Sequence, residues 1–331
     1  MKKNNRKFGF LDFITIAVIA LLVLASVNTN NFEFPVLDDE IIESTTETIE
    51  ETTDDSIEDT TKPEISDTDE NGLYSPRPDD YYHQLDKAGK EIYTEIYKVA
   101  QKGKTTFKFK NIDVKAYEKS VTSAVYAFVF DHPEFFWYNN GHLWIYGLNS
   151  FEVELSVDDY WKYSTNKNKY SVELQNKVDE IVAKANKFNT DYEKVKFVHD
   201  YIVNNTEYDE SALDDIVNGR ERSASSLQSA TPYGCLVKGK AICSGYSEAF
   251  QLLMDELGIE CNSVWGDAGG AHQWNVVKVD GDYYFIDCTW DDPIGVDEIQ
   301  YDYFLINLKE LSKTHKPDNT FDYPECTATK Y

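Results

Sequence analysis

The stretch AICSGYSEAFQLLMDELGI, residues 241–259, decides the fold because it predicts a helix with an unusual first turn. Apolar side chains recur along it at helical spacing, at Tyr246, Ala249, Phe250, Leu253 and Leu257. Gly258 follows, and glycine readily adopts the left-handed turn that ends a helix. The first turn holds Cys243-Ser244-Gly245, which are poor helix formers. The stretch therefore predicts a thiol at a helix N-terminus, where backbone N–H groups lack partners.

A thiol in this position is placed for nucleophilic chemistry. An ordinary thiol has a pKa of about 8.5, so only a few per cent is thiolate at neutral pH. The positive end of a helix and a nearby imidazolium both stabilise the anion. The backbone N–H groups of Cys243 and its neighbours are also suited to bind the oxyanion of an acyl-transfer intermediate. We expect Gly245 to leave room for a substrate backbone to approach.

The alternative for such a cysteine is a buried small hydrophobic residue or half of a disulfide. The chain has five cysteines, so at least one thiol is left over within the chain. We interpret Cys243 as that thiol, while Cys235, Cys261, Cys288 and Cys326 remain available for disulfides. The sequence has no CxxC pair and its histidines are scattered, so it predicts neither a metal site nor a cofactor.

Two strand-like runs follow the helix. HQWNVVKV (272–279) and DYYFIDCTW (282–290) are joined by Asp-Gly at 280–281, the strongest short signal for a two-residue hairpin turn. This register places Trp274 opposite Asp287. The helix and hairpin, which follow several helices, predict an α+β fold.

The hairpin register also supplies partners for the thiol. His272 and Trp274 share a face because side chains alternate along a strand. Asp287 is then a diagonal neighbour of His272, within reach of a hydrogen bond. Asp291 is the diagonal neighbour on the other side, so the register favours Asp287 but leaves both open. A thiol, an imidazole and a carboxylate that orients the ring form a known nucleophilic arrangement.

The rest of the folded part divides at about residue 165. Residues 79–165 predict a mainly helical accessory region, with Asp113 capping its second helix and a small sheet at GHLWIYGL (141–148) and FEVELSV (151–157). Residues 166–331 predict the catalytic domain.

Two more helices are expected at the start of that domain. Ser171 is expected to cap the first, and Thr190 to open a capping box at the start of the second. His199 lies on the second helix, where we interpret it as a structural histidine.

The N-terminal part predicts a location outside the cytoplasm. Residues 1–32 combine a basic start with an apolar run at 8–27, interrupted by Asp12, and predict a single-pass membrane anchor or a cleaved signal segment. Residues 33–78 are rich in Thr, Glu and Asp and predict an extended acidic stalk. The net charge of −27 argues against nucleic acid as a partner.

The quoted motifs resemble the transglutaminase-like superfamily, which shares a papain-like core. Two stretches carry this resemblance, GKAICSGYSEAFQLLMDELGI (239–259) and HQWNVVKVDGDYYFIDCTWDDP (272–293). Two others, DHPEFFWY (131–138) and the C-terminal YDYFLINLKELSKTHKPDNTFDYPEC (301–326), resemble the flanks of secreted or membrane-anchored bacterial members. The resemblance implies that the nucleophile lies at a helix N-terminus packed on an antiparallel sheet. It assigns Cys243 as nucleophile, His272 as base and Asp287 as orienting acid, and so decides against Asp291.

The resemblance further implies thiol-dependent acyl transfer on protein amides through a thioester at Cys243. A glutamine side chain is the expected acyl donor, and an amine or water the acceptor. A cysteine peptidase of the same core is the alternative, and a non-catalytic surface binding protein is a further one. The expected partners are a protein or peptide substrate at the cell surface and, through residues 8–27, the membrane; a secreted protein is the alternative.

Overall fold

The computed structural model describes most of the chain from residue 75 onward. The described ranges are 75–145, 149–162, 164–296, 298–329 and residue 331. The expected membrane segment at 8–27 and nearly all of the expected stalk at 33–78 lie outside the described residues. Within the described ranges, every helix is too short or too polar to cross a lipid bilayer.

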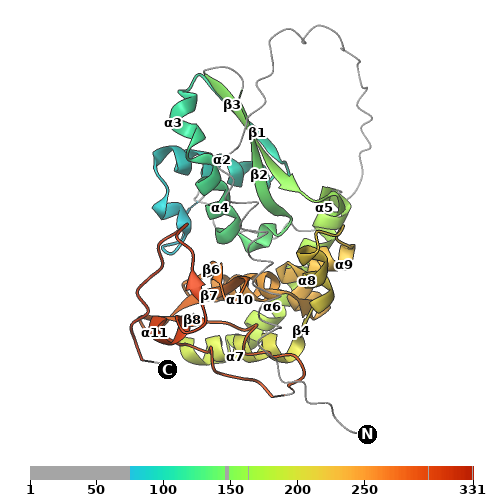
Figure 1. Cartoon of the computed structure of the whole chain (residues 1–331), viewed down its shortest axis with the longest axis vertical. Coiled ribbons are helices and arrows are strands. Elements are labelled where there is room, and N and C mark those ends of the chain that lie inside the picture. The colour runs from blue at the N-terminus through green and yellow to red at the C-terminus, as the bar shows by residue number, and fades with distance from the viewer. Residues whose placement is uncertain (1–74, 146–148, 163, 297, 330) are drawn as a thin grey trace.

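The first half of the described chain combines helices with a three-stranded antiparallel sheet (Figure 1). The sheet order is β1-β3-β2, so the strand that is last in sequence lies in the middle. The elements are η1 (Tyr81–Gln84), α2 (Lys87–Ala100), β1 (Thr106–Lys110), α3 (Val114–Glu118), α4 (Val121–Asp131), η2 (Pro133–Phe135), β2 (Tyr138–Ile145), β3 (Ser150–Val157) and α5 (Asp159–Lys162).

The second half places helices against a four-stranded antiparallel sheet of order β8-β7-β6-β9, with a two-stranded parallel pair β4-β5 beside it. The elements are α6 (Ser164–Ala185), α7 (Asp191–Asn205), β4 (Glu207–Tyr208), α8 (Glu210–Val217), α9 (Ala224–Ser229), η3 (Gly234–Lys238), β5 (Lys240–Ala241), α10 (Cys243–Leu257), β6 (Cys261–Asp267), β7 (Ala271–Val279), β8 (Asp282–Ile286), α11 (Leu308–Leu311) and β9 (Lys316–Pro317). The predicted α+β class is confirmed.

Local sequence signals explain several helix starts. Asp113 caps α3 by accepting a hydrogen bond from the backbone N–H of Lys115, as expected. Thr190 and Glu193 form the expected capping box of α7. Ser171 does not cap a helix: it lies inside α6, where its hydroxyl donates to the carbonyl of Lys167. Helix α6 therefore begins at Ser164, earlier than the expected cap at Ser171.

The hairpin forms around the predicted turn. Asp280 and Gly281 have φ values of 53° and 94°, both in the left-handed region that such a two-residue turn requires. Val279 pairs with Asp282, as expected, but the ladder ends where Asn275 pairs with Ile286. Asp287 therefore follows the last residue of β8, outside the ladder.

The two halves share one hydrophobic core. A continuous cluster of buried apolar side chains extends from residue 81 to residue 321, across both the accessory region and the sheet. Buried polar contacts also join them: Gln251 on α10 donates to the carbonyl of Phe130 at 2.7 Å and accepts from the backbone of Ser263 at 2.7 Å. The predicted domain boundary at 165 stays a prediction, but the parts on either side are packed together.

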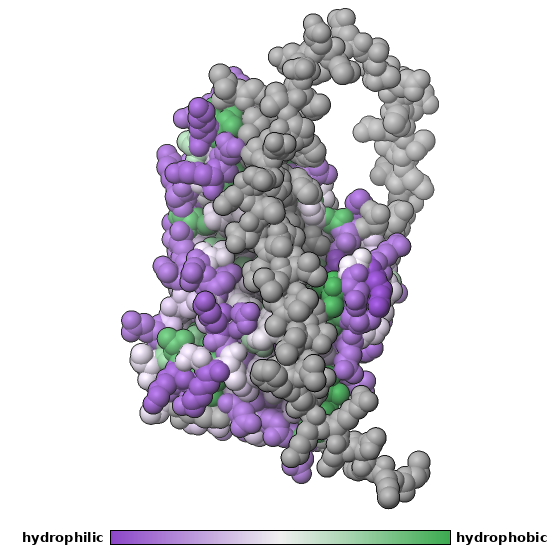
Figure 2. All heavy atoms as spheres, viewed as in Figure 1, coloured by the Kyte–Doolittle hydropathy of each residue, from purple (hydrophilic) through white to green (hydrophobic). Residues whose placement is uncertain are grey.

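The face of the molecule drawn in Figure 2 is mainly polar. On the face seen in Figure 2, hydrophilic side chains predominate among the described residues, and apolar side chains occur in small groups. Most buried apolar side chains of the helices and sheets lie in the shared core or in a smaller cluster that includes Val264, Trp274 and Phe285.

Gly245 has a different role from the one expected. A Cβ added at Gly245 would lie 2.6 Å from the carbonyl oxygen of Ser229 and 2.9 Å from that of Thr231. The space beside Gly245 is therefore filled by the protein's own backbone, not left open for a substrate, and the expectation was wrong. The absence of a side chain lets the first turn of α10 pack against the segment after α9.

We predict that Gly245→Ala destabilises the protein by about 1–3 kcal/mol, because backbone atoms have little freedom to move away from the new methyl group. Gly258→Ala is the matched control: Gly258 also adjoins α10, but an added Cβ meets nothing within 4 Å and only its φ of +70° is strained. Urea unfolding of both variants measures the difference. Equal stability of the two variants would contradict this account.

Candidate active site

Cys243 is the first residue of α10, as the sequence predicts. Ile242 precedes it in extended conformation and has no side chain that could cap the helix. Strand β5 holds this approach in place, since Ala241 pairs with Tyr208 of β4. The Ser244 hydroxyl donates to the carbonyl of Ala230 at 3.0 Å, which fixes the first turn from the other side. The backbone N–H groups at this helix end are thus available to stabilise an anion at the sulfur.

His272 and Asp287 form a short, buried hydrogen bond. The Nε2 of His272 lies 2.7 Å from the Oδ2 of Asp287, and the two residues are 7% and 1% exposed. The other carboxylate oxygen, Oδ1, accepts from the backbone N–H groups of Thr289 and Trp290 at 2.9 and 3.1 Å. Because Asp287 lies just past the ladder, its chain is free to turn and supply these two donors.

The charges in this cluster are coupled. Burial lowers the pKa of His272, but the charge and hydrogen bond of Asp287, together with a side-chain hydrogen bond to Cys243, raise it overall to about 10. Burial alone would raise the pKa of Asp287, but His272 and His315 hold it well below its usual range. At neutral pH the cluster therefore favours an imidazolium beside a carboxylate, with the Cys243 side chain in contact with the ring.

Asp291 belongs to a different pair. Its Oδ2 lies 3.1 Å from the Nε2 of His199, and its Oδ1 accepts from the backbone of Tyr303. Both His199 and Asp291 are fully buried, which agrees with a structural role for His199. The contacts thus resolve the choice that the hairpin register leaves open: Asp287 is the carboxylate that meets His272.

The sequence analysis missed His315. Its Nε2 lies 3.1 Å from the Oδ2 of Asp287, the same oxygen that His272 contacts. In the described part of the chain, His272, Asp287 and His315 bring three potential metal-ligand atoms within 4.8 Å of one another. Zinc bonds of about 2.0–2.2 Å in a tetrahedron would keep such atoms roughly 3.3 Å apart. The 2.7 Å contact of His272 with Asp287 is too short for that and fits a shared proton.

Tyr208 is a second residue that the sequence analysis missed. Burial, followed by the charge of Cys243, keeps its pKa far above the usual range for tyrosine. Its position on β4, paired with Ala241, places it beside the approach to Cys243. Tyr208 therefore stays protonated at neutral pH.

All five cysteines are free and buried. The disulfides that remained possible for Cys235, Cys261, Cys288 and Cys326 are thus not formed. Burial raises the pKa of Cys235 and of Cys326 to about 12, and it raises those of Cys261 and Cys288 well above the usual value. These four thiols are therefore protonated and unreactive at neutral pH.

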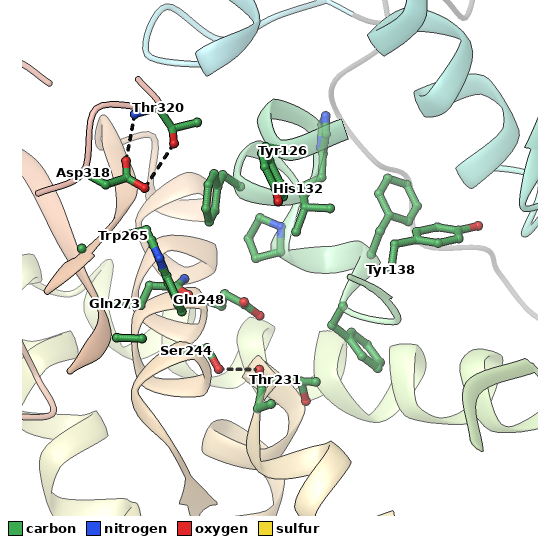
Figure 3. A pocket seen from close by; sticks show the side chains of 18 of the residues that line it. Tyr126, His132, Tyr138, Thr231, Ser244, Glu248, Trp265, Gln273, Asp318 and Thr320 are labelled. Carbon is green, nitrogen blue, oxygen red and sulfur yellow. Dashed lines mark hydrogen bonds between the residues drawn. The ribbon is translucent and has the colours of Figure 1, made fainter. Parts of the chain in front are cut away.

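A cavity of about 870 Å³ lies between the accessory region and the catalytic core. Ser244, next to Cys243, lines it together with Ala271 and Gln273, the two neighbours of His272. The opposite wall comes mainly from α4, η2 and the start of β2 and is rich in aromatic side chains. Figure 3 shows Glu248, Gln273 and Trp265 on one side of this cavity, and Tyr126, His132 and Tyr138 on the other.

Glu248 contributes a carboxyl group to this cavity. Burial raises its pKa to about 8, with Gln273 lowering it and the charge of Cys243 raising it further. Glu248 is therefore largely uncharged at neutral pH and can both donate and accept a hydrogen bond. The cavity thus offers an aromatic wall, a neutral acid and the amide of Gln273 close to the thiol.

Comparison with known proteins agrees with this geometry. Residues 178–288 match the model of the transglutaminase-like superfamily. The human protein named kyphoscoliosis peptidase is 27% identical over 164 residues, which is 43% of this chain and 23% of that protein; its mouse counterpart is 24% identical over 192 residues, 52% of this chain and 27% of that protein. The chain thus spans about a quarter of the length of these relatives.

A solved structure described as a TGase is 21% identical and has a TM-score of 0.34, with 50% of this chain and 48% of that one covered. The family match spans the start of α10 with Cys243, strand β7 with His272, and Asp287 just after β8. Residues 178–288 of this chain therefore form a domain of the transglutaminase-like superfamily, with an α+β papain-like core.

Proposed function

We propose that the protein carries out thiol-dependent acyl transfer on protein amides, with Cys243 as nucleophile, His272 as acid and base, and Asp287 as the group that orients His272. The observation that supports this most is the buried 2.7 Å contact between His272 and Asp287, with Cys243 touching the same ring from the start of α10. Such a reaction requires a nucleophile, a group that transfers protons and an acid that orients this group, and the three residues supply them.

The first half of the reaction forms a thioester. The Cys243 sulfur attacks the carbonyl carbon of a substrate amide, and the oxyanion is stabilised by backbone N–H groups at the helix terminus. As the carbon–nitrogen bond breaks, the imidazolium of His272 gives its proton to the leaving nitrogen. A primary amide of glutamine would release ammonia, and a peptide bond would release an amine.

The second half regenerates the thiol. An amine or water attacks the thioester, His272 takes the proton from the nucleophile, and the sulfur leaves. An amine acceptor gives transamidation, whereas water gives hydrolysis. We favour the transglutaminase-like reaction, with glutamine as acyl donor, because the motifs around Cys243, His272 and Asp287 lie within the match to the transglutaminase-like superfamily. A cysteine peptidase is the second candidate, because the curated relatives are named peptidases.

We further propose that this reaction takes place outside the cytoplasm, on a protein or peptide at the cell surface. The support is the apolar run at 8–27 after a basic start, followed by an acidic stalk at 33–78. If the protein were secreted and not anchored, the site would still lie outside the cytoplasm. The free cysteines are compatible with an oxidising compartment, because all five are buried and burial keeps four of them protonated.

Thiol alkylation tests the nucleophile. We predict that iodoacetamide modifies one thiol of the native protein rapidly at pH 6–7 and that peptide mapping locates it at Cys243. The other four cysteines are internal controls, since burial keeps them protonated. His272→Ala should slow the reaction at least tenfold, because the imidazolium no longer stabilises the thiolate. Equally slow labelling of all five thiols would support a non-catalytic binding protein.

A labelled primary amine and a glutamine-containing protein test the reaction. We predict label incorporation that is lost in Cys243→Ala and reduced roughly 10²- to 10⁴-fold in Asp287→Asn, by analogy with the loss of the orienting acid in other triads. Asp291→Asn is the matched control, because that carboxylate contacts His199 and not His272. Asp291→Asn should stay within tenfold of the unmodified protein. Protein fragments without label would identify a peptidase instead.

The raised pKa of His272 predicts how stability depends on pH. Its pKa is about 10 in the folded protein and about 6.5 in an unfolded chain. The contribution of its ion pair to folding is thus complete below about pH 6.5 and is lost as the pH rises through 10. We predict that the free energy of unfolding in urea falls more steeply between pH 7 and 10.5 in Cys243→Ala than in Cys243→Ala/His272→Gln. Parallel curves would contradict the assigned ion pair.

A further inference from the structure

A second histidine reaches the Asp287 carboxylate from outside the family domain. His315 belongs to the C-terminal segment, beyond the matched residues 178–288. It lies immediately before β9, whose two residues pair with Gly266 and Asp267 of β6. The site therefore receives a group that the family match does not account for.

Close packing brings this segment into place. A Cβ on Gly266 would lie 2.3 Å from the carbonyl oxygen of Lys316 and 2.7 Å from the ring of Trp274. Strand β9 can approach β6 this closely only because Gly266 has no side chain. The glycine thus determines how near His315 comes to the sheet and to Asp287.

The hydrogen bonds of His315 define the position of its proton. Its Nε2 lies 3.1 Å from the Oδ2 of Asp287, and its Nδ1 lies 2.8 Å from the Oγ1 of Thr314. An ionised carboxylate only accepts, so the Nε2 of His315 carries the proton that it donates. The Thr314 hydroxyl also accepts a hydrogen bond from the Tyr303 hydroxyl at 3.1 Å. Hydrogen bonds therefore connect Tyr303, Thr314, His315 and Asp287 in that order.

The ring of His315 has little freedom to turn. It is 3% exposed and is surrounded by Trp274, Trp290 and Tyr303, whose ring centroids lie 4.9, 4.5 and 5.2 Å away. A rigid donor in this position holds the carboxylate oxygen at a fixed place. His272 contacts that same oxygen.

The carboxylate of Asp287 accepts from four donors. Two are the rings of His272 and His315 on Oδ2, and two are backbone N–H groups on Oδ1. An ionised carboxylate has about four acceptor positions, so this set leaves it saturated. Each donor favours the charged form, whereas burial opposes it.

We propose that His315 is a positioning residue: it fixes the Asp287 carboxylate in its ionised form and so sets the orientation and charge of His272 for thiol chemistry at Cys243. The inference rests on the proposed roles of Cys243, His272 and Asp287. It assigns the C-terminal segment a part in the site. Without His315, the Oδ2 of Asp287 keeps only His272 as a donor, so the carboxylate is protonated more easily. As the pH falls, the imidazolium of His272 then loses its charged partner.

The test is the pH profile of Cys243 alkylation by iodoacetamide in the full-length protein, from pH 4 to 9. In His315→Leu we expect the acid-side midpoint to move to higher pH and the rate at pH 6 to fall roughly tenfold, the effect of losing one hydrogen bond to a charged group. In His315→Gln the side-chain amide can still donate, so most of the rate should return. This rescue distinguishes positioning from a loss of packing.

His199→Leu is the matched control. It removes another buried histidine that contacts aspartates, but these are Asp200 and Asp291 and not Asp287. Its profile should coincide with that of the unmodified protein. Thr314→Val is a milder test, because Thr314 is exposed and only its hydroxyl contacts the ring of His315. It should move the midpoint in the same direction as His315→Leu, with a change in rate of about threefold.

Coincident profiles for Thr314→Val, His315→Leu and the unmodified protein would overturn the proposal, as would an equal shift in His199→Leu. If His315→Leu does not fold, the Thr314→Val and His315→Gln profiles decide. Because alkylation needs no substrate, the proposed acyl transfer can fail while the role of His315 stands. The reverse outcome, turnover with an unchanged profile in His315→Leu, would refute only the positioning role.

Discussion

The site depends on one buried negative charge, the carboxylate of Asp287. Removing a carboxylate from water costs several kcal/mol unless donors replace the lost hydration. Here the donors come from three parts of the chain: His272 on β7, the backbone of the turn at 289–290, and His315 before β9. Asp287 therefore stays ionised only when all three segments are packed in place. The proposed chemistry at Cys243 thus depends on contacts between parts of the chain that are far apart in sequence.

The accessory region contributes to the site by forming part of the cavity beside Cys243. Its aromatic residues form one wall of the cavity, while the flanks of Cys243 and His272 form the other. Gln251 joins α10 to the accessory region and to β6 through two short hydrogen bonds, and both regions contribute buried apolar side chains to one cluster. The cavity is thus a product of packing between the two regions, and neither could define its shape alone.

The sequence allowed the central elements to be predicted because their signals are local. Helix α10 follows from the apolar spacing that ends at Gly258, and the hairpin follows from Asp280-Gly281. With the family resemblance, these elements indicate Cys243, His272 and Asp287 as candidates. Their catalytic roles stay predictions, but the structure brings them together.

What escaped prediction depends on contacts between distant segments. His315 meets Asp287 across 28 residues, and the strand beside it has only two residues, too few for any periodic pattern. Gly245 was misinterpreted because its neighbours, near Ser229 and Thr231, belong to a segment whose position the local sequence does not indicate. The pairing of Asp291 with His199 likewise joins two elements far apart in the chain.

The five cysteines illustrate how position decides chemistry. Four are enclosed by apolar surroundings or by acidic groups, and burial is the first cause of their raised pKa values. Cys288 is adjacent in sequence to Asp287, yet it is one of these four. Cys243 is also buried, but it lies at a helix terminus and contacts an imidazole that is itself charged through Asp287. Burial alone accounts for the unreactive state of the other four thiols. What distinguishes Cys243 is an oriented positive charge beside it, and the packing around Asp287 provides this charge.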